Sequence, residues 1–346
     1  MATQQRPFHL VVFGASGFTG QFVTEEVARE QVSPERNSHL PWAVAGRSRE
    51  KLQRVLERAA MKLGRPTLSS EVGIIICDIT NPASLDEMAK QATVVLSCVG
   101  PYRFYGEPVV KACVENGTSC IDICGEPQFL ELMYWKYHEK AAEKGVYIIG
   151  SSGFDSIPAD LGVIYTKNKM NGTLTAVESF LTIHSGPEVQ YAAYLTVGGI
   201  TSVIKLMFAG LFFLFFVRFS IGRQLLIKFP WLFSFGYFSK QGPTQRQIDA
   251  SSFTMTFFGQ GYSQGFGTDK SKPNIRICTQ VKGPEAGYVA TSIAMVQAAM
   301  TLLNDASDLP KVGGVFTPAA AFSRTKLIDR LTQRGIEFSV ISSSEV

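Results

Sequence analysis

The stretch FGASGFTG, residues 13–20, decides the fold, and three of its eight residues are glycine. It follows a valine-rich apolar run, residues 8–13, that suits a strand buried inside a parallel sheet. Residues 20–30 then have the spacing of a helix, with apolar side chains on one face and Glu25 and Glu26 on another. The glycines are therefore expected at a turn that connects a strand to a helix.

A turn in this position can hold a phosphate group, because a helix N-terminus presents unpaired N–H groups and the positive end of the helix dipole. Gly14 would form the tight turn, Gly17 would let a pyrophosphate approach the backbone, and Gly20 would let the helix pack closely on the strand. The spacing differs from G-x-G-x-x-G, and an ordinary glycine-rich turn is the alternative, but the position between strand and helix favours a cofactor. The candidate cofactor-binding residues of this turn are Gly14, Ser16, Gly17, Phe18, Thr19 and Gly20.

The end of the second predicted strand, residues 42–45, bears on which nicotinamide dinucleotide would bind. NAD-specific sites normally carry an acid here for the ribose 2′-OH, whereas an arginine accommodates the 2′-phosphate of NADP. This chain continues with Gly46, Arg47 and Ser48 and has no acid, so NADP(H) is the preferred cofactor and NAD(H) the second possibility. The alternative is that Arg47 is a solvated residue in the first turn of the next helix.

Strands and helices continue to alternate as far as residue 154. Further strands are predicted within 71–79, 93–102, 118–126 and 146–154, with helices at 81–92, 106–117 and 126–145. This alternation is typical of a doubly wound parallel sheet, in which ligands bind beyond the carboxyl ends of the strands. Asp78 would then meet the adenine side of the cofactor, and Gly100, Pro101 and Tyr102 would lie towards the nicotinamide.

Several segments resemble the saccharopine dehydrogenase-like oxidoreductases. They are GASGFTG (14–20), AGRSREKL (45–52), CVGPY (98–102), YGEPVVKAC (105–113), IDICGE (121–126) and GSSGFDSIPADLG (150–162). The resemblance covers the chain from about Pro7 to the C-terminus. The chain resembles saccharopine reductases and mycobacterial trans-acting enoyl reductases more distantly. The resemblance implies an α/β fold with an N-terminal Rossmann domain (1–165) and a second α/β domain (166–346) built on an antiparallel sheet. It also implies a substrate cleft between these two domains.

The residue pattern agrees with that implied second domain. Residues 175–186, 252–261 and 275–284 alternate apolar and polar side chains, as antiparallel strands with one buried face do. Residues 287–305 are predicted as a helix. One departure from the family lies after Glu188, which passes directly into VQYAAYLTVGG, residues 189–199. We therefore expect a chain shortened in its middle region, with the cofactor fold retained and the substrate pocket altered.

Hydride transfer is carried out by the nicotinamide, and the protein supplies orientation and at most one proton. The candidate proton donors near strand ends are Tyr102, Asp122, Glu126, Asp155 and Ser156, from which we select Tyr102 and Asp155 as catalytic candidates. FDSIP, residues 154–158, is also typical of a helix start, so capping by Asp155 or Ser156 is the stronger alternative. The spacing after Tyr102 is not Tyr-x-x-x-Lys, so no short-chain reductase mechanism is assigned.

Other classes of protein are disfavoured by composition. The four histidines and six cysteines lack metal-ligand spacing, so no metal site is expected and the cysteines are predicted to be reduced and mostly buried. The net charge is +4 and the basic residues are scattered, which argues against nucleic-acid binding. The N-terminus lacks the pattern of a secretory signal, so we expect a cytosol-facing protein.

Residues 203–239 form an aromatic segment with 10 of the 25 phenylalanines, four cations and no acid. Its longest uncharged run at the start, residues 206–217, has 12 residues, whereas a membrane-spanning helix needs about 20. One interpretation is a buried helix pair in the second domain or at a homodimer interface. The other is a monotopic anchor or hairpin, favoured because no polar face of normal width can be drawn through the run. The resemblance supports the second interpretation, since vertebrate members are associated with lipid droplets and membranes.

Together these features predict an NAD(P)-dependent oxidoreductase that uses NADP(H) and a lipid-related substrate at a membrane or lipid-droplet surface. Saccharopine itself is a poor candidate, because a dicarboxylic amino acid calls for clustered arginines in the cleft. The alternative is a catalytically weak or inactive Rossmann protein that acts as a binding or scaffolding protein on lipid.

Overall fold

The computed structural model describes residues 6–31, 40–184, 199–234, 242–265 and 272–345, with the backbone alone for 199–203. The junction expected after Glu188 lies outside these residues. Two compact units are formed, one by residues 1–181 together with 254–346 and the other by residues 182–253. The boundary expected between residues 165 and 166 stays a prediction.

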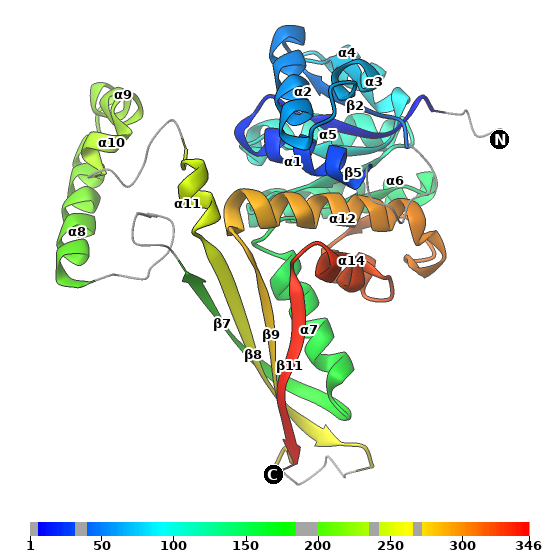
Figure 1. Ribbon diagram of the computed structural model, residues 1–346, viewed down its shortest axis with the longest axis vertical. Coiled ribbons are helices and arrows are strands. Elements are labelled where there is room, and N and C mark those ends of the chain that lie inside the picture. Colours follow the sequence, from blue (N-terminus) through cyan, green and yellow to red (C-terminus); the bar gives the residue numbers. More distant parts are fainter. Residues whose placement is uncertain (1–5, 32–39, 185–198, 235–241, 266–271, 346) are drawn as a thin grey trace. The chain divides into compact units, whose positions relative to one another are not determined.

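The larger unit contains a seven-stranded parallel sheet, which lies among the blue and cyan helices of Figure 1. Its strands, in chain order, are β1 (Phe8–Phe13), β2 (Trp42–Gly46), β3 (Gly73–Ile76), β4 (Ala92–Ser97), β5 (Ser119–Asp122), β6 (Tyr147–Ile149) and β10 (Gly314–Phe316). They are arranged as β10-β6-β5-β4-β1-β2-β3, so the order reverses between β1 and β4. Ligands bind at such a switch point in open α/β sheets. The observed strand order confirms the predicted doubly wound parallel sheet.

Strand β1 lies inside the sheet between β4 and β2, and its side chains are apolar because they are buried on both faces of the sheet. Leu10, Val11 and Val12 are fully buried, and Val11 pairs in parallel with Ala43 of β2 and Val95 of β4. Such a continuous run of valine and leucine is typical of a strand covered on both faces.

Helices follow the strands as predicted, and a short helix, α3 (Leu68–Glu71), was not predicted. They are α1 (Phe18–Glu30), α2 (Arg49–Leu63), α3 (Leu68–Glu71), α4 (Pro82–Gln91), α5 (Tyr102–Glu115) and α6 (Pro127–Lys144). Local signals set their ends: the Asn81 side chain accepts the N–H groups of Ala83 and Ser84 to begin α4, and Gly64 ends α2 in the left-handed conformation.

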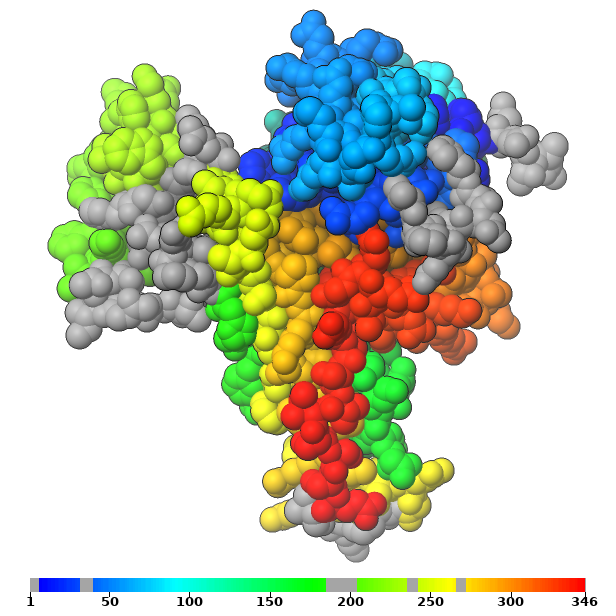
Figure 2. Space-filling view, viewed as in Figure 1, coloured from blue at the N-terminus to red at the C-terminus, as the bar shows by residue number. Residues whose placement is uncertain are grey.

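The acidic face of α1 is covered as well as its apolar face. Glu25 and Glu26 are buried, because α2 covers one side of α1 and α12 (Thr291–Asn304) covers another. Glu25 pairs with Lys62 at 2.6 Å, and Glu26 pairs with Arg334 at the end of α14 (Leu327–Gln333). Figure 2 shows this C-terminal part of the larger unit packed against its N-terminal part.

The seventh strand, β10, comes from the far end of the chain. Val315 pairs in parallel with Ile148 of β6, so the segment after α12 returns to the Rossmann sheet. The remaining elements of this region are η1 (Ala286–Ala290), η2 (Ala306–Asp308) and α13 (Pro318–Phe322).

The second sheet of the larger unit is antiparallel, as predicted, and has four strands in the order β11-β9-β8-β7. Its strands are β7 (Gly172–His184), β8 (Ser252–Ser263), β9 (Ile275–Pro284) and β11 (Glu337–Glu345). The helix α7 (Ile157–Lys169) packs against this sheet. Phe253 and Phe257 of β8 are buried, and a side chain at Gly162 of α7 would collide with the Phe257 ring. The edge strand β7 buries none of its described side chains, so the expected alternation does not become a buried face there.

Among the described residues, one helical stretch has the length and apolar composition of a membrane span, Ala286–Asn304. Most of it (78%) is buried within the larger unit. We therefore assign it to the protein core, and the helix predicted at 287–305 is confirmed.

The smaller unit contains α8 (Gly199–Phe216), α9 (Ser220–Lys228), α10 (Pro230–Phe233) and α11 (Gln245–Asp249). The aromatic segment therefore forms three helices with short breaks as far as Phe233, and residues 235–239 lie outside the described chain. Phe216 packs on Phe233 with ring centroids 5.0 Å apart, but many apolar side chains of α8 face outward. Met207, Leu214 and Phe215 are 57%, 62% and 60% exposed.

Candidate cofactor and active site

The glycine turn has the geometry that a phosphate-binding turn requires. Gly14 has a φ of +82°, and a Cβ there would lie 2.8 Å from the Val99 side chain. A Cβ at Gly20 would lie 2.2 Å from the Gly14 carbonyl oxygen, which the Gly17 N–H contacts at 2.9 Å. Side chains at these positions would force the start of α1 away from β1.

The N-terminus of α1 is open to an anion. Gly17 is its N-cap and supplies no side-chain hydrogen bond, and the first turn contains no acid. Gly17 and Phe18 are exposed, while Ser16 and Thr19 are half-buried at the rim. The first N–H groups of a helix have no partner within the helix, so this turn fits a pyrophosphate.

Arg47 lies at the carboxyl end of β2 and is exposed, directly after the buried Gly46. The Ser48 hydroxyl accepts the Lys51 N–H at 3.3 Å and begins α2, so the N-terminus of a second helix lies beside Arg47. The Asp78 Oδ1 atom accepts the backbone N–H and the hydroxyl of Thr80, both at 2.9 Å. These two bonds, with a smaller contribution from Arg47, lower the pKa of Asp78. A cation and a helix N-terminus together suit the 2′-phosphate of NADP.

On the side expected to face the nicotinamide, Gly100 and Pro101 are exposed and lead into α5, and Tyr102 is buried. The Tyr102 hydroxyl donates to the Ser97 carbonyl at 2.8 Å, and burial raises its pKa well above the ordinary value. The two carboxylate oxygens of Glu126 accept the N–H groups of Tyr102 and Arg103 at 2.8 and 3.0 Å. Glu126 therefore caps α5 from the loop after β5.

Asp155 is exposed in the loop after β6, beside Gly125 of the neighbouring loop. Pro158 lies in the first turn of α7 as predicted, but the N-cap Ser156 makes no side-chain cap hydrogen bond. The structure therefore brings Asp155 and the Tyr102–Glu126 pair to the carboxyl ends of adjacent strands, β6, β4 and β5. The catalytic assignments of Tyr102 and Asp155 stay predictions.

An aromatic contact beside the glycine turn (residues 14–20), called the phosphate turn below, was not predicted. The Tyr288 ring lies 4.6 Å from the Phe18 ring and 5.4 Å from the Phe22 ring, measured between centroids. The Glu285 carboxylate fixes this turn by accepting the N–H groups of residues 287–289 at 2.7–3.1 Å. Glu285 followed by a glycine two residues later is a local capping signal, but the contact with α1 depends on tertiary structure.

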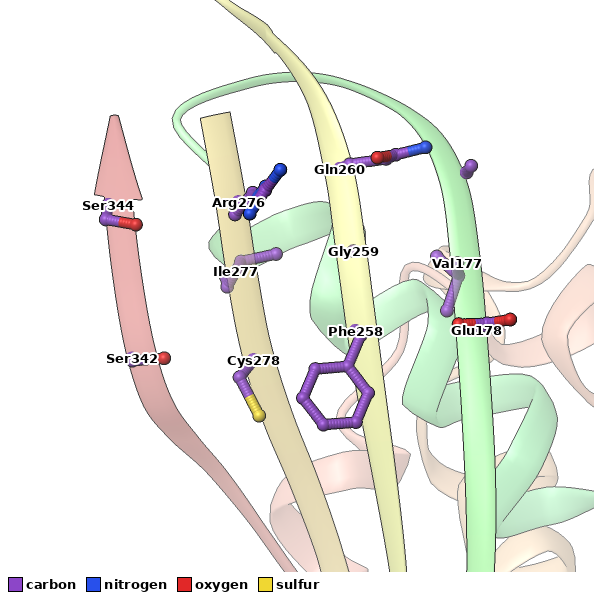
Figure 3. A pocket seen from close by; sticks show the side chains of 11 residues that line it. Val177, Glu178, Phe258, Gly259, Gln260, Arg276, Ile277, Cys278, Ser342 and Ser344 are labelled. Atoms are coloured by element: carbon purple, nitrogen blue, oxygen red, sulfur yellow. The ribbon is translucent and has the colours of Figure 1, made fainter. Parts of the chain in front are cut away.

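A separate hollow of about 630 Å³ lies on the four-stranded sheet (Figure 3). Side chains of all four strands line it, including Glu178, Phe258, Arg276 and Ser342. None of the residues singled out in the sequence lies there. Within the described residues, no group of three or more histidines, cysteines or acids is arranged to hold a metal ion, and all six cysteines are free.

The fold and the turn define a Rossmann-type dinucleotide-binding protein. Residues 10–149 match the saccharopine dehydrogenase NADP binding domain, which confirms the expected preference for NADP(H). A saccharopine dehydrogenase-like oxidoreductase of Bos taurus is 74% identical over an alignment of 429 positions that covers 100% of both chains. The chain therefore belongs to the saccharopine dehydrogenase-like oxidoreductase family.

More distant similarities agree with this assignment. A lipid droplet localized protein of Caenorhabditis elegans is 35% identical, with 98% of this chain and 99% of that protein covered. The fold is similar to apo saccharopine dehydrogenase (L-Glu forming) from Saccharomyces cerevisiae, with a TM-score of 0.55, 12% identity, and 97% and 100% of the two chains covered.

The alignment with the Bos taurus protein also bears on chain length. It is 429 positions long and this chain has 346 residues, so at least 83 aligned positions (429 minus 346) have no residue here. This agrees with a shortened chain, and the placement of the missing part after Glu188 stays a prediction.

Proposed function

We propose that this NADP(H)-dependent oxidoreductase acts on a lipid-related substrate at a membrane or lipid-droplet surface. The observation that carries the proposal for the cofactor is the open N-terminus of α1 together with Arg47 at an acid-free strand end. When bound, the nicotinamide supplies the hydride chemistry.

The residues of the chain would divide the remaining work. The backbone of residues 14–19 would hold the pyrophosphate, and Arg47 with the N-terminus of α2 would hold the 2′-phosphate. Gly100 and Pro101 would line the approach to the nicotinamide. Asp155 is the better candidate for exchanging a proton with substrate, because it is exposed whereas the Tyr102 hydroxyl is buried and donates to Ser97.

The lipid part of the proposal is supported by the surface of the smaller unit. Exposed apolar side chains occur along α8, α9 and α10, including Phe213, Ile221 and Trp231 at 56%, 72% and 58% exposure. Lys205, Arg218, Arg223 and Lys228 occur among them, and such a combination suits an interface of acyl chains and anionic headgroups. The name of the Caenorhabditis elegans relative points the same way.

The direct test is NADPH oxidation by the full chain in the presence of vesicles that contain long-chain ketones, aldehydes or enoyl lipids. The expected result is turnover of at least one of these classes that requires NADPH and is faster with the lipid in vesicles than with a short-chain soluble analogue. The Asp155→Asn variant should lose turnover while binding NADPH normally.

A scaffolding role is the second candidate, and the aligned positions that this chain lacks favour it. It predicts NADPH binding and vesicle binding with no turnover of any lipid class. A protein that turns over soluble analogues as well as vesicle-borne lipids would contradict the lipid-surface proposal.

A further inference from the structure

A second cavity, of about 430 Å³, lies in the larger unit between α6 and the carboxyl ends of β5, β6 and β10. This volume is within the range of small-molecule pockets, roughly 300–1,000 Å³. None of the residues that line it belongs to the phosphate turn or to the Arg47 region. It is therefore distinct from the site proposed for the cofactor.

Asp122 lines this cavity and is buried, with only 3% of its surface exposed. Its Oδ1 atom accepts the backbone N–H groups of Cys124 and Ser151 at 2.9 and 3.2 Å. The hydrogen bonds that the described residues make to this carboxylate all go to Oδ1, and Oδ2 is not among the fully enclosed unpaired atoms. Oδ2 is therefore free to accept a hydrogen bond from a group inside the cavity, where a donor would offset the cost of burying the carboxylate.

The backbone around Asp122 is shaped to leave this space. A Cβ at Gly150 would lie 2.5 Å from the Leu130 side chain and 3.5 Å from Asp122 Oδ1. Ser151 adopts a φ of +57°, which is uncommon for a residue with a side chain and is found more often at functional sites.

The walls are apolar and the opening is aromatic. Phe129, Met133 and Ile148 line the interior and are each at most 2% exposed. At the rim, the His138 ring lies 4.6 Å from the Tyr134 ring and 5.7 Å from the Phe316 ring, measured between centroids. Aromatic faces at an entrance attract cations as well as apolar groups.

No cation from the protein neutralises Asp122 in the cavity. None of the described lining residues is lysine or arginine, and the other acid, Glu131, is exposed at the rim. The His138 Nδ1 atom lies 3.2 Å from the backbone of Val315, which occupies that nitrogen. The cavity thus combines an apolar body, an aromatic mouth and one uncompensated acid.

We propose that this cavity is a second binding site, for a small apolar amine whose ammonium group donates to Asp122 Oδ2 and whose body packs on Phe129, Met133 and Ile148. The ammonium group supplies both the missing hydrogen bond and the missing positive charge, and a charge-assisted hydrogen bond in a buried site is strong. The proposal is independent of the substrate at the nicotinamide.

The test is calorimetric titration of the full chain with three probes of one shape: 1-naphthylmethylamine, 1-naphthylmethanol and 1-methylnaphthalene. The amine is expected to bind saturably at one site, at least about tenfold more tightly than the alcohol, because only it carries the charge. Absence of saturable amine binding, or equal affinity for amine and alcohol, would overturn the proposal.

Two variants locate the site. Asp122→Asn keeps an oxygen for the Cys124 and Ser151 N–H groups and should abolish the preference for the amine, whereas Glu131→Gln removes the same charge at the rim and should preserve it. Ala320→Trp at the opening should block all three probes, which keeps the test decisive if Asp122→Asn folds poorly. Retained NADPH binding shows that each variant is folded. Amine binding that survives both Asp122→Asn and Ala320→Trp would place it elsewhere and contradict the proposal.

Discussion

At the residue scale, Arg47 is the side chain on which cofactor choice depends. In the Arg47→Ala variant we expect NADPH affinity to fall about tenfold to a hundredfold, because one charge-assisted contact to the 2′-phosphate is lost. The affinity for NADH should change little, since NADH has no 2′-phosphate. Titration with both cofactors checks this. Arg54→Ala is the matched control, because Arg54 is an exposed arginine in the second turn of α2. Equal losses for NADPH and NADH would refute the role of Arg47.

Asp122 makes a second prediction at this scale, for stability against pH. Burial raises the pKa of Asp122 from 3.8 to about 6, so the folded state holds the proton more tightly than the unfolded chain does. The stabilisation is complete below about pH 4 and is lost as the pH rises through 6. Cys98, Tyr102 and Cys120 around it stay neutral in this window, because burial is among the causes that raise the pKa of each.

The Asp122→Asn variant removes this ionisation. From pH 4.5 to pH 7.5 its free energy of unfolding should rise relative to that of the parent protein by about 2 kcal/mol. Urea unfolding of both proteins at the two pH values measures the difference. Parallel pH profiles would show that Asp122 is not held in a desolvated site.

At the element scale, the turn before α12 shows how one side chain fixes a helix start. Glu285 is buried and its carboxylate accepts three backbone N–H groups. Glu285→Ala should lower the free energy of unfolding by about 2 kcal/mol, since it removes a helix cap and leaves donors unpaired. Glu87→Ala, at an exposed pair with Lys90 on α4, should have almost no effect in the same urea titration. Similar effects of the two variants would contradict the capping role.

The elements that could be predicted are those with strong local signals. The six strands before residue 154 have apolar runs and glycine or proline boundaries, and the phosphate turn follows from glycine spacing. β10 has three residues, and its pairing joins Val315 to Ile148, about half of the chain apart, so no local pattern reveals it. Similarly, Glu126 capping α5, Tyr288 packing on Phe18 and the cavity at Asp122 are products of tertiary contacts. Sequence therefore located the cofactor turn and the strand ends beside it, such as Arg47, but not the tertiary contacts that surround them.

The aromatic helices lead to a prediction on lipid binding. Leu214→Glu combined with Phe215→Glu should strongly reduce flotation of the protein with phosphatidylcholine vesicles, because charges would enter the acyl region. Met61→Glu is the matched control, since Met61 is 78% exposed on α2 of the larger unit. Vesicle binding that is unchanged in the double variant would contradict an anchor in α8.

At the scale of the whole molecule, the central claim is that this chain, although shorter than its relatives, retains a working NADP(H) site. The most direct measurement is a titration of the purified full chain with NADPH and, separately, with NADH, followed by nicotinamide fluorescence. We predict saturable binding of both or of NADPH alone, with NADPH bound at least about tenfold more tightly. Failure of NADPH to bind, or equal affinity for the two dinucleotides, would contradict the assignment of the glycine turn and Arg47.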